Sequence, residues 1–393
     1  MTPASPLAHR LEGFGASIFA EMTALAVSTG SINLGQGFPD YDGPVDVLRI
    51  AQEQIAAGAN QYPPGIGAPD LRHAISEHQQ RFWGLPYDPD TEVLVTMGAT
   101  EALAGALLGM LNTGDEVIVF EPLFDTYAAC IALAGAALVP VTLRPNEAGR
   151  WEFDPDQLRS AVTTRTRMIL LNSPHNPAGT VFTRDELQLV ADIAINHDLI
   201  VVSDEVYEHL TFDGAVHIPM ATLPGMRERT VTISSGGKSF NTTGWKIGWA
   251  CAPPPLLNAV RMAKQLFTFA GGTPFQPAIA AGLRLPDAYF HGLADDLRRK
   301  RDVLAAGLAE AGIMPYRSDG TYFLTADIRG VSPDGDGMAF CRSMPARYGV
   351  VAIPAGVLYS PANQSEGRHI VRFAFCKQLP TITAAAERLS AGK

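Results

Sequence analysis

Between residues 92 and 250, short apolar segments alternate with amphipathic stretches, and this alternation limits the folds open to the chain. The apolar segments are rich in Val, Ile and Leu and nearly continuous in apolarity, as strands buried on both faces are. The expected strands are Val93–Met97, Glu116–Phe120, Ala137–Leu143, Met168–Asn172, Leu199–Asp204, Thr230–Ser234 and Ile247–Cys251. The pattern predicts an α/β fold with a mostly parallel, mixed seven-stranded sheet between helices.

Two helix starts carry capping signals. Thr183-Arg-Asp-Glu186 is a capping box that predicts a helix to about His197, and Asp154-Pro155 combines a cap with a first-turn proline. After about residue 285, a long charged helix at Tyr289–Ala311 predicts the start of a smaller α+β domain. Its strands are expected at Thr321–Ala326, Val350–Ile353 and His369–Phe375. The predicted division is an N-terminal arm packing with the small domain (1–45), a large domain (46–284) and a small C-terminal domain (285–393).

Length and charge narrow the class of protein. A chain of 393 residues is long enough for more than one domain. The formal net charge of −10 argues against a general nucleic-acid or membrane-surface role. The four cysteines are scattered without metal-ligand spacing, and the N-terminus has no basic region followed by an apolar one. No disulfide framework, metal site, signal peptide or membrane span is therefore expected, and the predicted location is the cytoplasm.

The stretch that carries most chemical information is Ser234-Ser-Gly-Gly-Lys-Ser-Phe-Asn-Thr-Thr-Gly-Trp-Lys-Ile-Gly-Trp249. Lys238 follows two glycines directly after a predicted buried strand, so its amine can project into the crevice where open α/β sheets bind ligands. Ser235 lies three residues before this lysine and Lys246 lies eight residues after it. Considered alone, the stretch is equally well a turn between strand and helix with surface lysines.

Two further motifs follow neighbouring strands: Asn172-Ser-Pro-His-Asn-Pro-Ala-Gly179 and Ser203-Asp-Glu-Val-Tyr207. With the lysine stretch, they resemble the motifs of fold type I, pyridoxal-phosphate-dependent aminotransferases of class I and II, over almost the whole chain. The resemblance implies that Lys238 carries pyridoxal 5′-phosphate as a Schiff base and that Ser235 and Lys246 contact its phosphate. Lysine at position 246, where the family often has arginine, is similar to the branch of N-succinyldiaminopimelate and kynurenine aminotransferases.

The other cofactor contacts follow from the same resemblance. Asp204 would keep the pyridine nitrogen protonated so that the ring accepts electrons, and Asn176 and Tyr207 would hydrogen-bond the phenolic oxygen. Without the resemblance, the first motif is a good turn and Asp204 a helix cap. Gly98-Ala99-Thr100 opens a predicted helix, whose N-terminus suits the phosphate. Phe124 would stack on the ring, although by itself it is more typical of a core residue.

The remaining matches concern substrate and partner. The Gly37 amide would approach the substrate α-carboxylate, and Arg372, whose guanidinium fork fits a carboxylate, would clamp it together with Asn176. By sequence alone, Arg372 is equally well an exposed strand charge. Tyr62 resembles the tyrosine that reaches the neighbouring subunit's phosphate, which implies a homodimer with composite active sites. The segment Phe267–Pro274, which lines the partner's pocket in the family, has no Arg or Lys, so an aspartate-type specificity is disfavoured.

The resemblance implies an enzyme that moves an amino group from an amino acid to a 2-oxo acid, with 2-oxoglutarate and glutamate as the expected pair. The expected donor is N-succinyl-LL-diaminopimelate, of lysine biosynthesis. Kynurenine or glutamine–phenylpyruvate transamination is the alternative, and β-elimination on cysteine conjugates is a different reaction class open to the same lysine. A DNA-binding regulator built on this fold is disfavoured, because the chain has neither spare length nor basic charge.

Overall fold

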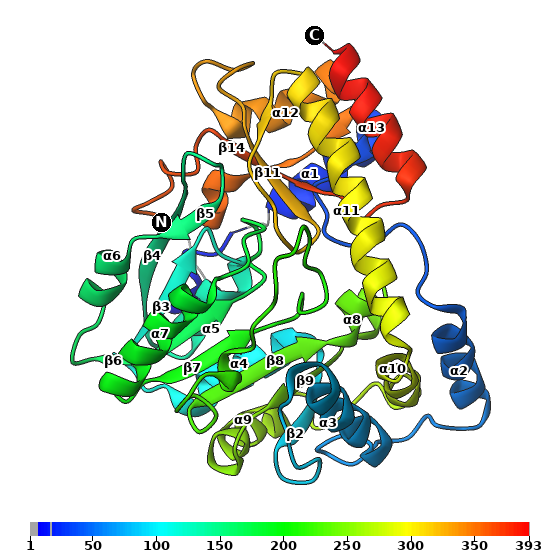
Figure 1. Cartoon of the computed structure of the whole chain (residues 1–393), viewed down its shortest axis with the longest axis vertical. Coiled ribbons are helices and arrows are strands. Elements are labelled where there is room, and N and C mark those ends of the chain that lie inside the picture. The colour runs from blue at the N-terminus through cyan, green and yellow to red at the C-terminus, as the bar shows by residue number, and fades with distance from the viewer. Residues whose placement is uncertain (1–6, 16–17, 393) are drawn as a thin grey trace, which may run out of the picture.

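A computed structural model describes residues 7–15 and 18–392 and contains one large mixed sheet at its centre (Figure 1). The strand order is β2-β9-β8-β7-β6-β3-β4-β5. The bounds are β2 Val93–Met97, β3 Glu116–Glu121, β4 Ala137–Pro145, β5 Trp151–Phe153, β6 Thr166–Asn172, β7 Ile200–Asp204, β8 Thr230–Ser235 and β9 Ile247–Cys251. All seven predicted strands are present, within two residues of their expected ends.

The pairing confirms a mostly parallel sheet. Strands β4, β3, β6, β7 and β8 pair in parallel, whereas β9 runs antiparallel between β8 and β2. The sheet has eight strands rather than the seven expected, because β5 turns back antiparallel onto β4. Three residues with an alternating burial pattern are too short a segment to stand out in the sequence.

Helices cover both faces of this sheet, and successive strand residues explain how. In β3, Val117 and Val119 pack with the α4, α5 and α9 side, while Ile118 and Phe120 pack with the α6 and α7 side. The capping box predicted at Thr183 is present and starts α7. The helices are α2 Val45–Ala56, α3 Pro69–Trp83, α4 Gly98–Met110, α5 Asp125–Leu133, α6 Pro155–Ser160, α7 Arg184–Asn196, α8 Gly236–Ser239, α9 Pro254–Phe267 and α10 Gln276–Leu283.

A smaller sheet has the strand order β10-β11-β14-β13. The long helix α11 runs from the half of the molecule that holds the large sheet to the half that holds this smaller one (Figure 1). Its strands are antiparallel, and their bounds are β10 Met314–Pro315, β11 Phe323–Asp327, β13 Ile353–Pro354 and β14 Ile370–Ala374. Near it, β1 Ile32–Asn33 pairs in parallel with β12 Val350–Val351, which joins the N-terminal segment to this half. The associated helices are α1 Ile18–Thr29, α11 Asp287–Glu310, α12 Gly337–Tyr348 and α13 Leu379–Ala391.

Parallel pairing brings the chemistry-bearing residues to one edge of the large sheet. The carboxyl ends of parallel strands lie side by side, and the register places Asn172 at the end of β6 opposite Asp204 at the end of β7. Ser235 ends the next parallel strand, β8, just before Lys238. A crevice at this edge is where such sheets bind ligands. Among the described residues, no helix has both the length and the apolarity to cross a bilayer.

Candidate active site

A cavity of about 380 Å³ opens at this edge, between the large sheet and the smaller one. Twelve of the thirteen predicted site residues line it: Gly37, Gly98, Ala99, Thr100, Phe124, Asn176, Asp204, Tyr207, Ser235, Lys238, Lys246 and Arg372. The thirteenth, Tyr62, lies outside it with 80% of its surface exposed, edge-on to Phe269 at 5.8 Å between ring centroids. The sequence motifs therefore converge in space, apart from Tyr62, whose expected role involves a second subunit.

Lys238 reaches the cavity from the short helix α8. A Cβ at Gly236 would lie 2.7 Å from the Ile279 side chain, and one at Gly237 would lie 3.0 Å from Thr243 Cα. The two glycines are therefore needed for this close approach. The Lys238 Nζ donates a hydrogen bond of 2.7 Å to the Tyr322 hydroxyl. Burial lowers the pKa of Lys238 to about 8, so about a tenth of the amine is neutral at pH 7, far more than for an exposed lysine.

Asp204 lies at the base of the cavity with 4% of its surface exposed. Its carboxylate accepts a 2.7 Å hydrogen bond from the Tyr127 hydroxyl and one of 3.3 Å from the Val206 amide. Burial raises the pKa of Asp204 to about 6, which outweighs the lowering by these hydrogen bonds. A cation inside the cavity would offset this desolvation, so the site fits a ring that carries a protonated nitrogen.

A second group of residues forms an anion-binding corner. Gly98 begins α4 with φ of 71°, and its backbone packs so closely on Gly248 that a Cβ at Gly248 would lie 2.4 Å from the Gly98 carbonyl carbon. The Lys246 Nζ lies 3.3 Å from the Thr100 hydroxyl at this helix N-terminus. Free N–H groups of a 13-residue helix, a hydroxyl and an ammonium together fit a phosphate group.

Arg372 lies on β14, on the opposite wall of the cavity, and only 3% of its surface is exposed. Its Nη1 donates to Asn176 Oδ1 at 3.3 Å and its Nη2 to the Gly35 carbonyl at 2.9 Å, while its buried Nε has no partner in the described structure. Burial lowers the pKa of Arg372 to about 10, so the side chain remains a cation at neutral pH. A buried guanidinium that pairs with no carboxylate among the described residues suits an anionic substrate group.

Comparison with known proteins agrees with this geometry. A model of the family described as aminotransferase class I and II matches residues 29–389. The chain belongs to this family. Members depend on pyridoxal phosphate, and this chain is a transaminase that acts on amino acids and 2-oxo acids.

Individual aminotransferases are similar over nearly the full length. A probable N-succinyldiaminopimelate aminotransferase of Mycobacterium tuberculosis is 51% identical, with 97% of each chain covered. The methionine aminotransferase of Escherichia coli is 39% identical, again with 97% of each covered. The solved structure of N-succinyldiaminopimelate aminotransferase from Mycobacterium tuberculosis superposes with a TM-score of 0.95 at 50% identity, and covers 98% of this chain and 100% of its own.

The sequence did not predict three residues that the structure places at the site. Tyr127 bonds Asp204, Tyr322 bonds Lys238, and Asn172 holds two loops together. The Asn172 Nδ2 donates to the Asp204 carbonyl at 2.8 Å, and its Oδ1 accepts from the Asn176 amide at 2.7 Å. Asn172 begins one of the motifs quoted from the sequence, and Tyr127 lies three residues after Phe124, but the sequence does not show the hydrogen-bond partners of either residue.

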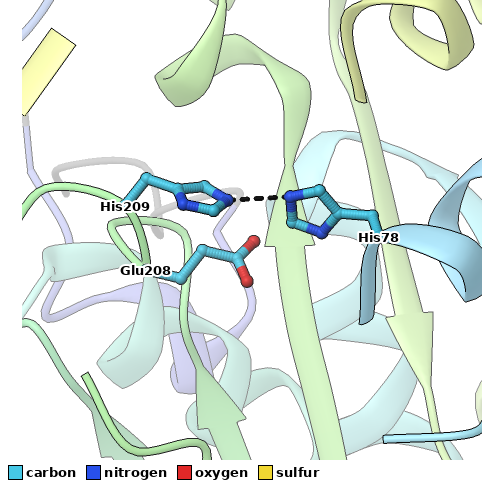
Figure 2. A group of neighbouring side chains, drawn as sticks. All are labelled: His78, Glu208 and His209. Atoms are coloured by element: carbon cyan, nitrogen blue, oxygen red, sulfur yellow. Dashed lines mark hydrogen bonds between the residues drawn. The ribbon is translucent and has the colours of Figure 1, made fainter. Parts of the chain in front are cut away.

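Behind the loop after β7, His78, Glu208 and His209 form a cluster that the sequence did not predict, and each offers one atom within 4.8 Å of the others (Figure 2). The two imidazoles share a hydrogen bond of 2.8 Å between their Nε2 atoms, and the Glu208 carboxylate accepts from Trp83 Nε1 at 2.6 Å and Ser234 Oγ at 2.7 Å. Burial lowers the pKa of both histidines, so both are neutral near pH 7. The cluster thus supports the loop that carries Asp204 and Tyr207.

Proposed function

We propose that this aminotransferase uses N-succinyl-LL-diaminopimelate as amino donor and 2-oxoglutarate as acceptor, a reaction of lysine biosynthesis. The observation that carries the proposal is the 51% identity, over 97% of both chains, with a probable N-succinyldiaminopimelate aminotransferase. The absence of Arg and Lys from the segment Phe267–Pro274 argues against an aspartate-type pocket.

The proposed roles follow from where the residues lie. When bound, pyridoxal phosphate supplies a ring that accepts electrons from the substrate Cα. Asp204 would hold a proton on the ring nitrogen, and Asn176 and Tyr207 would hydrogen-bond the ring oxygen. Lys238 would carry the cofactor, and its Nζ would take the proton from the substrate Cα as a general base and deliver it as a general acid.

The other residues bind and orient. Gly98, Ala99, Thr100, Ser235 and Lys246 hold the phosphate through backbone N–H groups, hydroxyls and one ammonium group. Phe124 stacks on the ring. Arg372 binds the α-carboxylate that every donor and acceptor shares, with Asn176 and the Gly37 amide beside it. An enzyme that alternates between two substrates can therefore use one clamp for both.

A donor screen tests the substrate. With 2-oxoglutarate as acceptor, kcat/KM for N-succinyl-LL-diaminopimelate is expected to exceed that for kynurenine, glutamine and methionine by at least about tenfold, a difference of ~1.4 kcal/mol in transition-state binding. Kynurenine is included in the screen because a kynurenine–oxoglutarate transaminase of Dictyostelium discoideum is 38% identical to this chain. A preference for kynurenine or glutamine would replace the proposed donor. Pyruvate release from a cysteine conjugate without an oxo acid would instead reveal β-elimination.

We further propose a cytoplasmic homodimer in which Tyr62 reaches the phosphate of the neighbouring subunit. Phe269 lies edge-on to Tyr62 and is exposed, and the preceding helix α9 exposes three more large apolar side chains: Met262, Leu266 and Phe267. Such a patch favours a covered interface. Sedimentation equilibrium is expected to give about twice the 42.0 kDa chain mass. A monomer with full activity would contradict composite sites.

The division into an arm (1–45), a large domain (46–284) and a small domain (285–393) also stays a proposal, supported by the two separate sheets.

A further inference from the structure

We propose that Tyr322 is a positioning residue for the amine of Lys238 and that it couples this amine to the N-terminal segment around Gly37. The inference deepens the proposed role of Lys238 and does not depend on which amino acid is the donor. Tyr322 lies on the smaller-sheet side of the cavity, 84 residues away in sequence from the lysine that it contacts.

The hydrogen bonds fix the direction of the contact. The Tyr322 hydroxyl donates its single proton to the Gly37 carbonyl at 2.6 Å, so only its lone pairs face Lys238. The Lys238 Nζ donates to this oxygen at 2.7 Å. Because the hydroxyl cannot turn its proton toward the amine without losing the carbonyl, it holds the amine in one orientation.

The surroundings hold Tyr322 itself rigidly. Its surface is 2% exposed, and its ring lies edge-on to that of Tyr207 at 5.2 Å. The preceding residue, Thr321, has a φ of 68°, a conformation that is costly for a β-branched residue. Its amide donates to the Leu210 carbonyl at 2.9 Å, and its hydroxyl accepts from the Phe323 amide at 3.0 Å. The backbone directly before Tyr322 is therefore strained and is held by two hydrogen bonds. This arrangement indicates that the fold fixes the position of the Tyr322 ring.

The N-terminal segment packs tightly on the same place. A Cβ at Gly37 would lie 2.5 Å from the Phe323 ring and 3.2 Å from the Tyr322 ring, so this segment can approach only as glycine. Two residues earlier, the Gly35 carbonyl accepts a hydrogen bond from Arg372. The proposed carboxylate clamp therefore binds a carbonyl of this short segment directly, and the proposed base is connected to the same segment through Tyr322. A carboxylate that competes for Arg372 would also act on the segment that holds Tyr322.

Removing the hydroxyl has a defined effect on the lysine. Burial raises the pKa of Tyr322 well above its ordinary value, so the phenol stays protonated and can only accept from Lys238. A hydrogen bond accepted from an ammonium stabilises the charged form. Tyr322→Phe should therefore lower the pKa of Lys238 below its value of about 8. General loss of packing would not produce this directed shift.

The first measurement is the rate at which apo-protein takes up pyridoxal phosphate, followed by absorbance across neutral and alkaline pH. Only the neutral amine reacts, so the wild-type rate should rise with pH and reach half its maximum near pH 8. In Tyr322→Phe the midpoint is expected about one pH unit lower, equivalent to the loss of one charge-assisted hydrogen bond. Tyr348→Phe is the matched control, because it removes a buried hydroxyl that has no hydrogen-bond partner within residues 7–15 and 18–392. Its midpoint should equal that of the wild type.

The second measurement uses the holoenzyme with an amino donor deuterated at Cα. Tyr322→Phe is expected to lower kcat about five- to tenfold, leave KM for the donor nearly unchanged and increase the primary isotope effect, because proton transfer slows. An unshifted uptake midpoint in Tyr322→Phe, or equal effects in Tyr348→Phe, would overturn the proposal. The uptake assay contains no donor, so an error in the proposed substrate leaves its outcome unchanged.

Discussion

Replacing Lys238 with alanine is expected to reduce transamination by at least about a thousandfold, because in the proposed mechanism the same amine tethers the cofactor and moves the Cα proton. Among the described residues, no second amine is placed to take over. Lys246, the other lysine lining the cavity, bonds Thr100 at the anion-binding corner. The variant should still bind pyridoxal phosphate reversibly, because the corner is intact. Steady-state rates and covalent retention of the cofactor after borohydride reduction are the two measurements.

The control for this variant is Lys300→Ala. Lys300 is a buried lysine, 4% exposed, but its Nζ bonds Asp296 at 2.6 Å, and the residue lies on α11 away from the cavity lining. The Lys300→Ala variant should be less stable than the wild type, but it should still retain the cofactor covalently after borohydride reduction. Near-normal transamination by Lys238→Ala would refute the role of this lysine, whatever the donor.

Replacing Arg372 with lysine is expected to lower kcat/KM about a hundredfold, or ~2.7 kcal/mol, for the amino donor and for the 2-oxo acid alike. The positive charge remains, but the planar fork that matches a carboxylate is lost. Because both half-reactions begin with the same carboxylate, the two losses should be similar. The measurements are single half-reactions followed by absorbance, one with each substrate.

Arg342→Lys serves as the comparison, because Arg342 is an exposed arginine paired with Glu21 at 2.7 Å. Exposed pairs contribute little, so its kinetic constants should change less than about twofold. A loss confined to one of the two substrates would show that Arg372 binds a side chain rather than the shared carboxylate.

Much of the large sheet was predictable because its strands are buried on both faces. Such strands read as unbroken apolar runs, and Val93–Met97 and Ile247–Cys251 have the same bounds in sequence and structure. Strand β5 was missed because a three-residue segment carries no periodic signal. The segment expected at Val350–Ile353 is two short strands, β12 and β13, that belong to different sheets. Sequence alone does not mark where a strand changes its partner.

The site was predictable as far as its motifs are local. Glycines next to Lys238 and the turn after β6 carry their own signals, and the parallel register brings them together. The two tyrosines that bond the reactive groups were missed for a physical reason. Tyr127 and Tyr322 contact residues 77 and 84 positions away, and a tyrosine in an apolar segment is indistinguishable from a core residue. Whether Tyr62 completes a site depends on a second chain, which the geometry of one chain does not contain.

The double hydrogen bonding of Asn172 has a consequence for how enzymes of this shape diversify. The Asn172 side chain connects the backbone at the end of β7 to the backbone of the turn after β6, so neither can shift without disturbing the other. The side of the cavity formed by Asn176 and Asp204 is therefore held in a fixed position. New donor preferences should therefore arise on the opposite wall, where the glycine segment and the smaller sheet close over the substrate, and natural variation in specificity is expected to concentrate there.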